Sequence, residues 1–254
     1  YIGSGALDGE GIPTNFFNDI DVRKGFNYAF DWDVYIADGL SGEGAQRGSP
    51  IIDGLTYFNP DAKMYSLDLD KAEEHLKAAL GGEVWEKGFK FTLLYNSGNI
   101  PRKTACGIIA ENLYSINPLF QVSIQPADWR SVMIPNLVTS KMPMFQIGWM
   151  ADYPDPDNFV FPFMHSAGTF AHFQNYSNPE VDALIEAGKF ELDPAARKDI
   201  YYELQDWYYD DAPGIMMAQG FARKYFTKYI HGFYYNPMNP VYPGPLWEMT
   251  KSES

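Results

Sequence analysis

This sequence of 254 residues has little cysteine, few basic residues and no long apolar run. The one cysteine, Cys106, rules out an intrachain disulfide and a thiolate metal cluster. Only 19 lysines and arginines stand against 33 aspartates and glutamates, and the formal net charge is −14. We therefore expect no nucleic-acid partner, because binding to phosphates depends on basic side chains. No run reaches the roughly 18–20 apolar residues of a transmembrane helix.

The opening stretch, YIGSGALDGEG, lacks the basic and apolar regions of a signal peptide, and it has no initiator methionine. Both absences would follow if the sequence were an excised piece of a longer protein. By contrast, aromatic residues are plentiful at 17%, with 18 tyrosines and 18 phenylalanines. Most of these rings are expected in a large core. The excess suggests a groove for ligands with both apolar and polar faces.

Helical and extended patterns alternate along the chain. Apolar periodicity predicts helices over 19–36, 67–82, 101–116, 128–140, 179–191 and 194–211. Strand-forming residues predict strands over 89–95, 120–126, 143–149, 214–219 and 222–230. An exposed loop is expected over 39–54, and an irregular segment over 161–178. This alternation predicts an α/β fold with a largely parallel or mixed sheet flanked by helices.

The stretch GWMADYPDPDNF, residues 148–159, carries three aspartates and two prolines after the predicted strand 143–149. Ligands of open α/β sheets bind at the carboxyl ends of strands, so this loop is a candidate site. A calcium loop of the EF-hand type is not expected. Counted from Asp152, the sixth position is Asp157 instead of glycine, and the twelfth is Phe163 instead of glutamate.

Catalysis has no clear signature in the sequence. The motifs G-x-S-x-G, H-E-x-x-H, G-x-G-x-x-G and the P-loop are absent, and the four histidines are dispersed. A glycosidase would need a second acid facing Asp152 across a cleft, and none stands out. We expect no catalytic residue, no metal site and no cofactor. A hydrolase remains the less favoured alternative.

Binding is the remaining interpretation of the loop. Asp152 lies three residues after Trp149, and a carboxylate beside an indole can hold an ammonium group while the ring covers its apolar neighbour. The alternative is that Asp152 only caps the turn, and the residues alone leave both open. Asp155, Asp157 and Asn158 are expected to form a rigid, solvated turn that ends in a helix cap and presents Trp149 and Asp152.

Five segments, in order, resemble the extracellular solute-binding proteins of family 5, the oligopeptide and dipeptide class of ABC importers. They are DVRKGFNYAFDWDVYI, LDLDKAEEHLKAALGG, GWMADYPDPDNF, YSNPEVDALIEAG and DPAARKDIYYELQDWYYDDAPGIMM. The resemblance implies one lobe of a two-lobed clamp of the type II periplasmic-binding-protein kind. It implies a C-terminal ligand-binding lobe over 1–219 and a return segment over 220–254 that runs toward a missing N-terminal lobe.

The same resemblance implies a function. The protein would capture peptides outside the cytoplasm and deliver them to the transmembrane permease of an ABC transporter, without chemistry of its own. An oligosaccharide-binding member of the family is the alternative. Whether a lipid anchor precedes the chain is left open.

The resemblance also assigns residues. Asp152 would pair with the α-ammonium of a bound peptide, Trp149 would line a side-chain pocket, and the backbone near Met150 would pair with an extended ligand. Gln146 stands where some family members carry an arginine that neutralises the ligand carboxylate. This departure disfavours short peptides with a free carboxylate. Longer peptides or oligosaccharides remain as expected ligands.

Overall fold

The two longest strands, β2 (Phe89–Asn96) and β3 (Phe120–Ala127), pair in parallel along their whole length. A parallel pair needs a crossover connection, and α5 (Ile100–Ile116) supplies it. The helix begins sharply because Asn99 accepts a hydrogen bond from the Arg102 backbone and a proline occupies its first turn. This strand–helix–strand unit is the frame on which the first part of the chain is built.

The first core cluster lies between this unit and two helices, α1 (Ile20–Tyr28) and α3 (Leu69–Ala78). Phe26 packs its ring 5.7 Å from that of Phe89 and 6.4 Å from that of Phe91. Burying each such ring contributes about 2–3 kcal/mol. Gly25 allows the two helices to approach closely, since a Cβ there would lie 2.7 Å from Leu76 Cγ.

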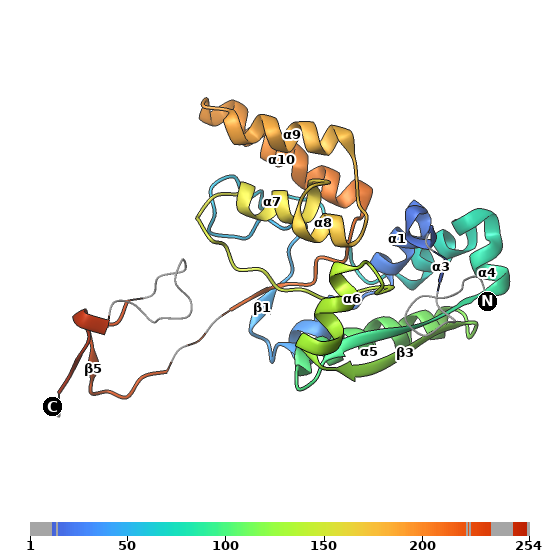
Figure 1. Ribbon diagram of the computed structural model, residues 1–254, viewed down its shortest axis with the longest axis horizontal. Coiled ribbons are helices and arrows are strands. Elements are labelled where there is room, and N and C mark those ends of the chain that lie inside the picture. The colour runs from blue at the N-terminus through green and yellow to red at the C-terminus, as the bar shows by residue number, and fades with distance from the viewer. Residues whose placement is uncertain (1–11, 14, 222, 224, 235–245, 253–254) are drawn as a thin grey trace.

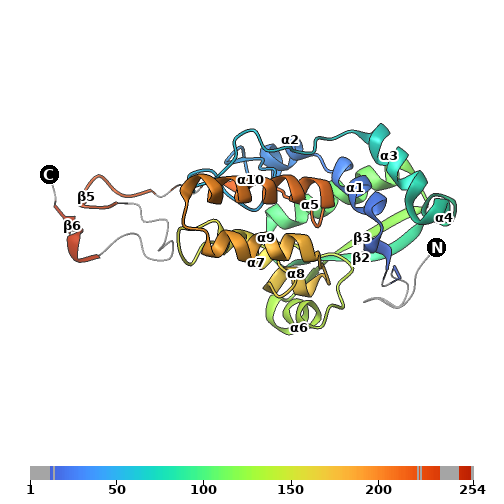
Figure 2. The same cartoon turned by 90° about the horizontal axis from the view of Figure 1, so that it is seen from above.

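A second core cluster joins α7 (Asp157–Met164), α9 (Pro179–Phe190) and α10 (Pro194–Asp211). Figure 1 shows these helices and α8 (Thr169–Phe173) grouped apart from β2, β3 and α5, and Figure 2 shows α9 beside α10. On α10, Arg197, Tyr201 and Gln205 recur every four residues and so share one face. Gln205 is fully buried and bonds the backbone at Tyr57 and Asn59, which fixes the loop before α3.

The two clusters are tied together at the end of α10. Arg23 on α1 donates to the backbone carbonyl of Asp211 at 3.0 Å, while Tyr176 donates to the carboxylate of the same aspartate. Trp32 donates its indole N–H to the carbonyl of Met216. These long-range bonds hold the two groups of helices in one arrangement.

The structure, a computed structural model, describes residues 12–13, 15–221, 223, 225–234 and 246–252. The remaining helical elements are η1 (Phe16–Asn18), α2 (Trp32–Val34), η2 (Tyr35–Gly39), η3 (Ala79–Gly82), α4 (Glu83–Lys87), η4 (Trp129–Met133), α6 (Ile134–Val138) and η5 (Leu246–Glu248). The short strands are β1 (Gly44–Ala45), β4 (Gln219–Gly220), β5 (Ile230–His231) and β6 (Thr250–Lys251). β1 pairs antiparallel with β4, and β5 with β6. β5 lies away from the groups formed by α1–α10 (Figure 1).

The predicted α/β class and most long elements are confirmed. α5, α9 and α10 begin and end within one residue of the predicted bounds, and so do β2 and β3. The chain also restarts its helix at α6 with Pro135 in the first turn, as predicted. The predicted boundary between 219 and 220 falls inside β4, and much of 220–254 lies outside the described residues.

Several predicted elements differ from the structure in detail. Residues 143–149 form no strand, because no neighbour among the described residues supplies ladder hydrogen bonds. The helix 19–36 is broken after Tyr28, where Asp31 caps a new turn. The segment 161–178 is not irregular, since it holds most of α7 and all of α8. The late strands 214–219 and 222–230 shrink to parts of β4 and β5, and the parallel and antiparallel pairs lie in separate two-stranded sheets.

Candidate functional site

The loop that carries the candidate residues connects α6 to α7, and therefore links the two groups of helices (Figure 1). Its tight end is a turn closed by the Asp155 backbone N–H, which donates to the Tyr153 carbonyl at 2.9 Å. Asp155 Oδ1 then accepts from the Asp157 backbone N–H at 2.9 Å and starts α7. The three aspartates of this loop occupy three different environments.

Asp155 is fixed to α10. Its two carboxylate oxygens accept hydrogen bonds from the two terminal nitrogens of Arg197 at 2.9 and 3.0 Å. Arg197 also donates through Nε to the Gly188 carbonyl, so its guanidinium is anchored on both sides. The hydrogen bonds to Asp155 raise the pKa of Arg197. Asp155 therefore has a structural role, as predicted.

Asp157 is enclosed at the first turn of α7. Its side chain is only 8% exposed, and its Oδ2 accepts from the Tyr153 hydroxyl at 2.8 Å. Burial and this hydrogen bond raise the pKa of Tyr153. Within the described part of the chain, Oδ1 of Asp157 has no hydrogen-bond partner. A negative charge at a helix N-terminus is favourable, so Asp157 supports the start of the helix. The prediction that this turn is solvated is wrong for Asp157.

Asp152 differs from both. Its side chain is exposed, and the described residues place no hydrogen bond or ion pair on its carboxylate. Its backbone N–H, by contrast, is held by Asn158 Oδ1 at 2.8 Å. The arrangement fixes the backbone at this position and leaves the charged group available to solvent or to a ligand.

Trp149 is held in a similar way. Its indole N–H donates to the Asn158 carbonyl at 2.8 Å, and its ring meets Phe170 edge-on at 5.6 Å between centroids. The neighbouring Met150 is 63% exposed. Backbone groups from 142 to 151 make no backbone–backbone hydrogen bond within the described ranges. An extended segment with unpaired N–H and C=O groups is what an added strand requires.

The side chain of Gln146 points toward α5. Its amide nitrogen donates to the Arg102 carbonyl at 3.1 Å and contacts Cys106 Sγ at 2.9 Å, both on α5. Its amide oxygen is buried without a hydrogen-bond partner among the described residues. Burial raises the pKa of the Cys106 thiol to about 12, so this cysteine is protonated and unsuited to nucleophilic chemistry.

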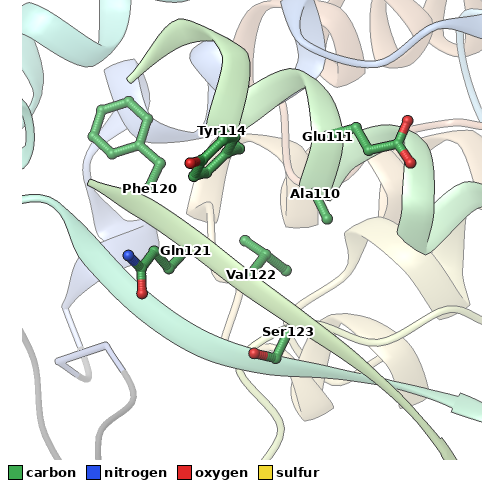
Figure 3. Close-up of a pocket in the computed structure, with 7 residues that line it drawn as sticks. All are labelled: Ala110, Glu111, Tyr114, Phe120, Gln121, Val122 and Ser123. Carbon is green, nitrogen blue, oxygen red and sulfur yellow. The ribbon is translucent and has the colours of Figure 1, made fainter. Parts of the chain in front are cut away.

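Metal sites, hollows and membrane-spanning helices can each indicate a function apart from the loop. No group of three or more histidine, cysteine, aspartate or glutamate residues is arranged to hold a metal ion. A hollow of about 300 Å³ lies between α5 and β3 (Figure 3). It is lined by Ala110, Glu111, Tyr114 and residues 120–123, and shares none with the loop. None of the helices in the described ranges has the length and apolar character needed to cross a bilayer.

The structure thus brings Trp149, Met150 and Asp152 onto one loop and turns Gln146 toward α5. Sequence reasoning placed Asn158 in the turn that presents Trp149 and Asp152 but missed its hydrogen bonds to both residues. A signal was present, since asparagine commonly bonds nearby backbone N–H groups in turns. It also missed Arg197, whose partner lies 42 positions earlier and has no local signature.

Comparison with known proteins gives a consistent result. The family of bacterial extracellular solute-binding proteins, family 5 (middle part), matches residues 9–171. Heme-binding protein A of Haemophilus influenzae is 24% identical over 226 residues, which cover 87% of this chain and 40% of that protein. The dipeptide-binding protein of Escherichia coli is 24% identical over 237 residues, which cover 87% of this chain and 41% of that protein.

A solved structure extends the comparison. The periplasmic binding protein DppA of Helicobacter pylori, in complex with the peptide STSA, has a TM-score of 0.69 and 27% identity. The match covers 80% of this chain and 39% of that one. The fold is therefore that of a lobe of type II periplasmic binding proteins. The chain spans about 40% of the length of the curated relatives it matches. These relatives are solute-binding proteins of the periplasm or cell exterior.

Proposed function

We propose that this chain, which belongs to family 5 of the bacterial extracellular solute-binding proteins, is the peptide-capturing lobe of an ABC importer. In this proposal residues 1–219 form the C-terminal ligand-binding lobe, and 220–254 run toward another lobe. The protein works outside the cytoplasm and hands its ligand to a transmembrane permease. It performs no catalysis. Capture proceeds by closure of two lobes around the ligand, a common form of domain motion.

The observation that carries this proposal is the state of Asp152. Its carboxylate is exposed and unpaired within the described part of the chain, while its backbone is fixed. A peptide α-ammonium would supply the missing partner through a charge-assisted hydrogen bond, which is about twice as strong as a neutral one. The unpaired backbone around Met150 would then pair with the extended peptide that follows the ammonium.

The charge of the loop also selects among ligand classes. Heme-binding protein A, as named, binds heme, which carries two carboxylates that the Asp152 charge would repel. Oligosaccharides carry no ammonium and would leave Asp152 unpaired. Gln146 is neutral, and its amide nitrogen already contacts α5, so this residue offers neither a positive charge nor a free donor to a peptide carboxylate. Peptides whose carboxylate lies beyond this position therefore fit best.

A thermal-shift panel on the complete protein that contains this sequence tests the proposal. The panel consists of trialanine, pentaalanine, N-acetylated pentaalanine, cellotriose and haemin. A ligand at 100 times its Kd adds about 2.7 kcal/mol to stability, so binding raises Tm measurably. We expect a shift with pentaalanine and a much smaller one with its acetylated form. A shift with cellotriose or haemin, and none with the peptides, would reject the proposed ligand class.

A further inference from the structure

We propose that Asn158 is the positioning residue of this site, which orients Trp149 and Asp152 for ligand binding without touching the ligand itself. The effect on ligand binding rests on the proposed function. The hydrogen bonds that hold the loop do not depend on it. Asn158 lies in the first turn of α7 and is 6% exposed. It bonds both residues at the same time, from two different oxygens.

The side-chain oxygen holds the backbone of the loop. Asn158 Oδ1 accepts from the Asp152 backbone N–H at 2.8 Å and lies 3.3 Å from the Trp149 indole nitrogen. An amide oxygen has two lone pairs and can serve both donors. Without it, the Asp152 N–H has no partner among the described residues, and the loop gains other conformations. The direction of the Asp152 carboxylate would then vary, and hydrogen bonds weaken steeply with poor angles.

The backbone oxygen of Asn158 holds the indole, and Pro162 explains why it is available. In a regular helix the N–H of residue 162 would donate to the carbonyl of residue 158. Proline has no N–H, so this carbonyl lacks its helical donor. The Trp149 indole N–H occupies it at 2.8 Å. Pro162 therefore frees an acceptor for Trp149, a residue of the candidate site.

Asn158 can hold the loop in one conformation because Asn158 is itself held in place by its neighbours. Its backbone N–H donates to the Asp155 carbonyl at 3.1 Å, and Asp155 is paired with Arg197 on α10. The next two residues of α7, Phe159 and Val160, are buried in the protein. An uncharged amide suits the position, since a carboxylate there would be buried close to Asp155 and Asp157. The loop thus takes its shape from the helix.

The test compares Asn158→Ala with Asn117→Ala in the complete protein. Asn117 is a matched control, because it is 9% exposed and its Oδ1 accepts from the Leu119 backbone at 3.0 Å. Both changes remove a buried amide, and only one lies at the candidate site. We expect Asn158→Ala to bind pentaalanine at least 10-fold more weakly than the unaltered protein, and Asn117→Ala less than 2-fold.

Hydrogen exchange without any peptide gives an independent readout. In the unaltered protein, the Trp149 indole N–H and Asp152 amide should exchange at least 10-fold more slowly than the Tyr153 amide, which has no hydrogen-bond partner in the described ranges. Asn158→Ala should remove this protection. Where that variant fails to fold, Pro162→Ala replaces it. Its new N–H competes for the carbonyl and should speed indole exchange without lowering Tm.

Two results would overturn the inference. One is equal exchange of the Trp149, Asp152 and Tyr153 protons in the unaltered protein. The other is an Asn158→Ala affinity no weaker than that of Asn117→Ala. If the unaltered protein binds no peptide, the proposed function fails, and the exchange comparison still decides whether Asn158 positions the loop.

Discussion

Arg197 and Asp155 form a two-pronged ion pair, with nitrogen–oxygen distances of 2.9 and 3.0 Å, across 42 positions of the chain. The pair joins the candidate ligand loop to α10. The guanidinium of Arg197 also lies over the rings of Tyr57 and Tyr201, at 5.6 and 5.2 Å from their centroids. One side chain of α10 therefore fixes two loops, and the shape of the candidate site depends on a helix that contributes no ligand contact in our proposal.

Asp155→Asn should lower the free energy of unfolding by about 1–3 kcal/mol, since it weakens two charge-assisted hydrogen bonds at a mostly buried pair. Urea denaturation measures the loss. Asp53→Asn is the control, because Asp53 pairs with Arg47 at 3.3 Å but is 61% exposed. That change should cost less than about 1 kcal/mol. Equal losses for the two variants would show that the Asp155 pair contributes no more than a surface contact.

Cys106 should resist thiol reagents in the native protein. The side chain is fully buried, and burial raises the pKa of its thiol to about 12, so thiolate is scarce at pH 8. Reaction with a chromogenic disulfide reagent should be complete within seconds in 6 M guanidinium and negligible over the same time in buffer. Rapid labelling of the native protein would contradict the packing of α5 against Gln146.

Buried tyrosines should make the protein sensitive to alkali. Burial raises the pKa of Tyr28 to about 12 and also raises that of Tyr65, Tyr176, Tyr201 and Tyr208. Below pH 10, the ordinary value, both folded and unfolded states keep these protons and stability is unaffected. Between pH 10 and 12 the unfolded state releases them first, so stability falls as pH rises.

Urea denaturation at pH 8, 10 and 11.5 tests this expectation, together with absorbance at 295 nm, which counts ionised tyrosines. The tyrosines whose pKa is raised should ionise only above pH 10 or together with unfolding. A reversible titration of all tyrosines around pH 10 in the folded protein would contradict their burial.

Local rules predicted the helices well because their signals are local. Asp193 and Asn178 each cap a helix that begins with proline, and both helices lie where the sequence places them. Strand-forming residues predicted a strand over 143–149, but a strand exists only where a neighbour supplies hydrogen bonds. Pro162 removes one hydrogen bond from α7, which forms nevertheless because tertiary burial of Val160 and Met164 outweighs the missing bond.

In the candidate site, too, the sequence predicts local features but not those that depend on tertiary contacts. The sequence identified GWMADYPDPDNF and the structural role of Asp155. It could not separate Asp152 from a turn cap, since that distinction depends on which carboxylates find partners in three dimensions. Arg197 and Tyr153 satisfy Asp155 and Asp157, whereas Asp152 has no such partner in the described chain.

The most direct test of the central claim is the calorimetric affinity of the complete protein for pentaalanine, before and after Asp152→Asn. If Asp152 pairs with the peptide ammonium, the change should weaken binding by about 1.5–3 kcal/mol, and N-acetylation of the peptide should have a similar effect on the unaltered protein. The two changes together should cost little more than either alone. An affinity that Asp152→Asn leaves unchanged would remove Asp152 from the site.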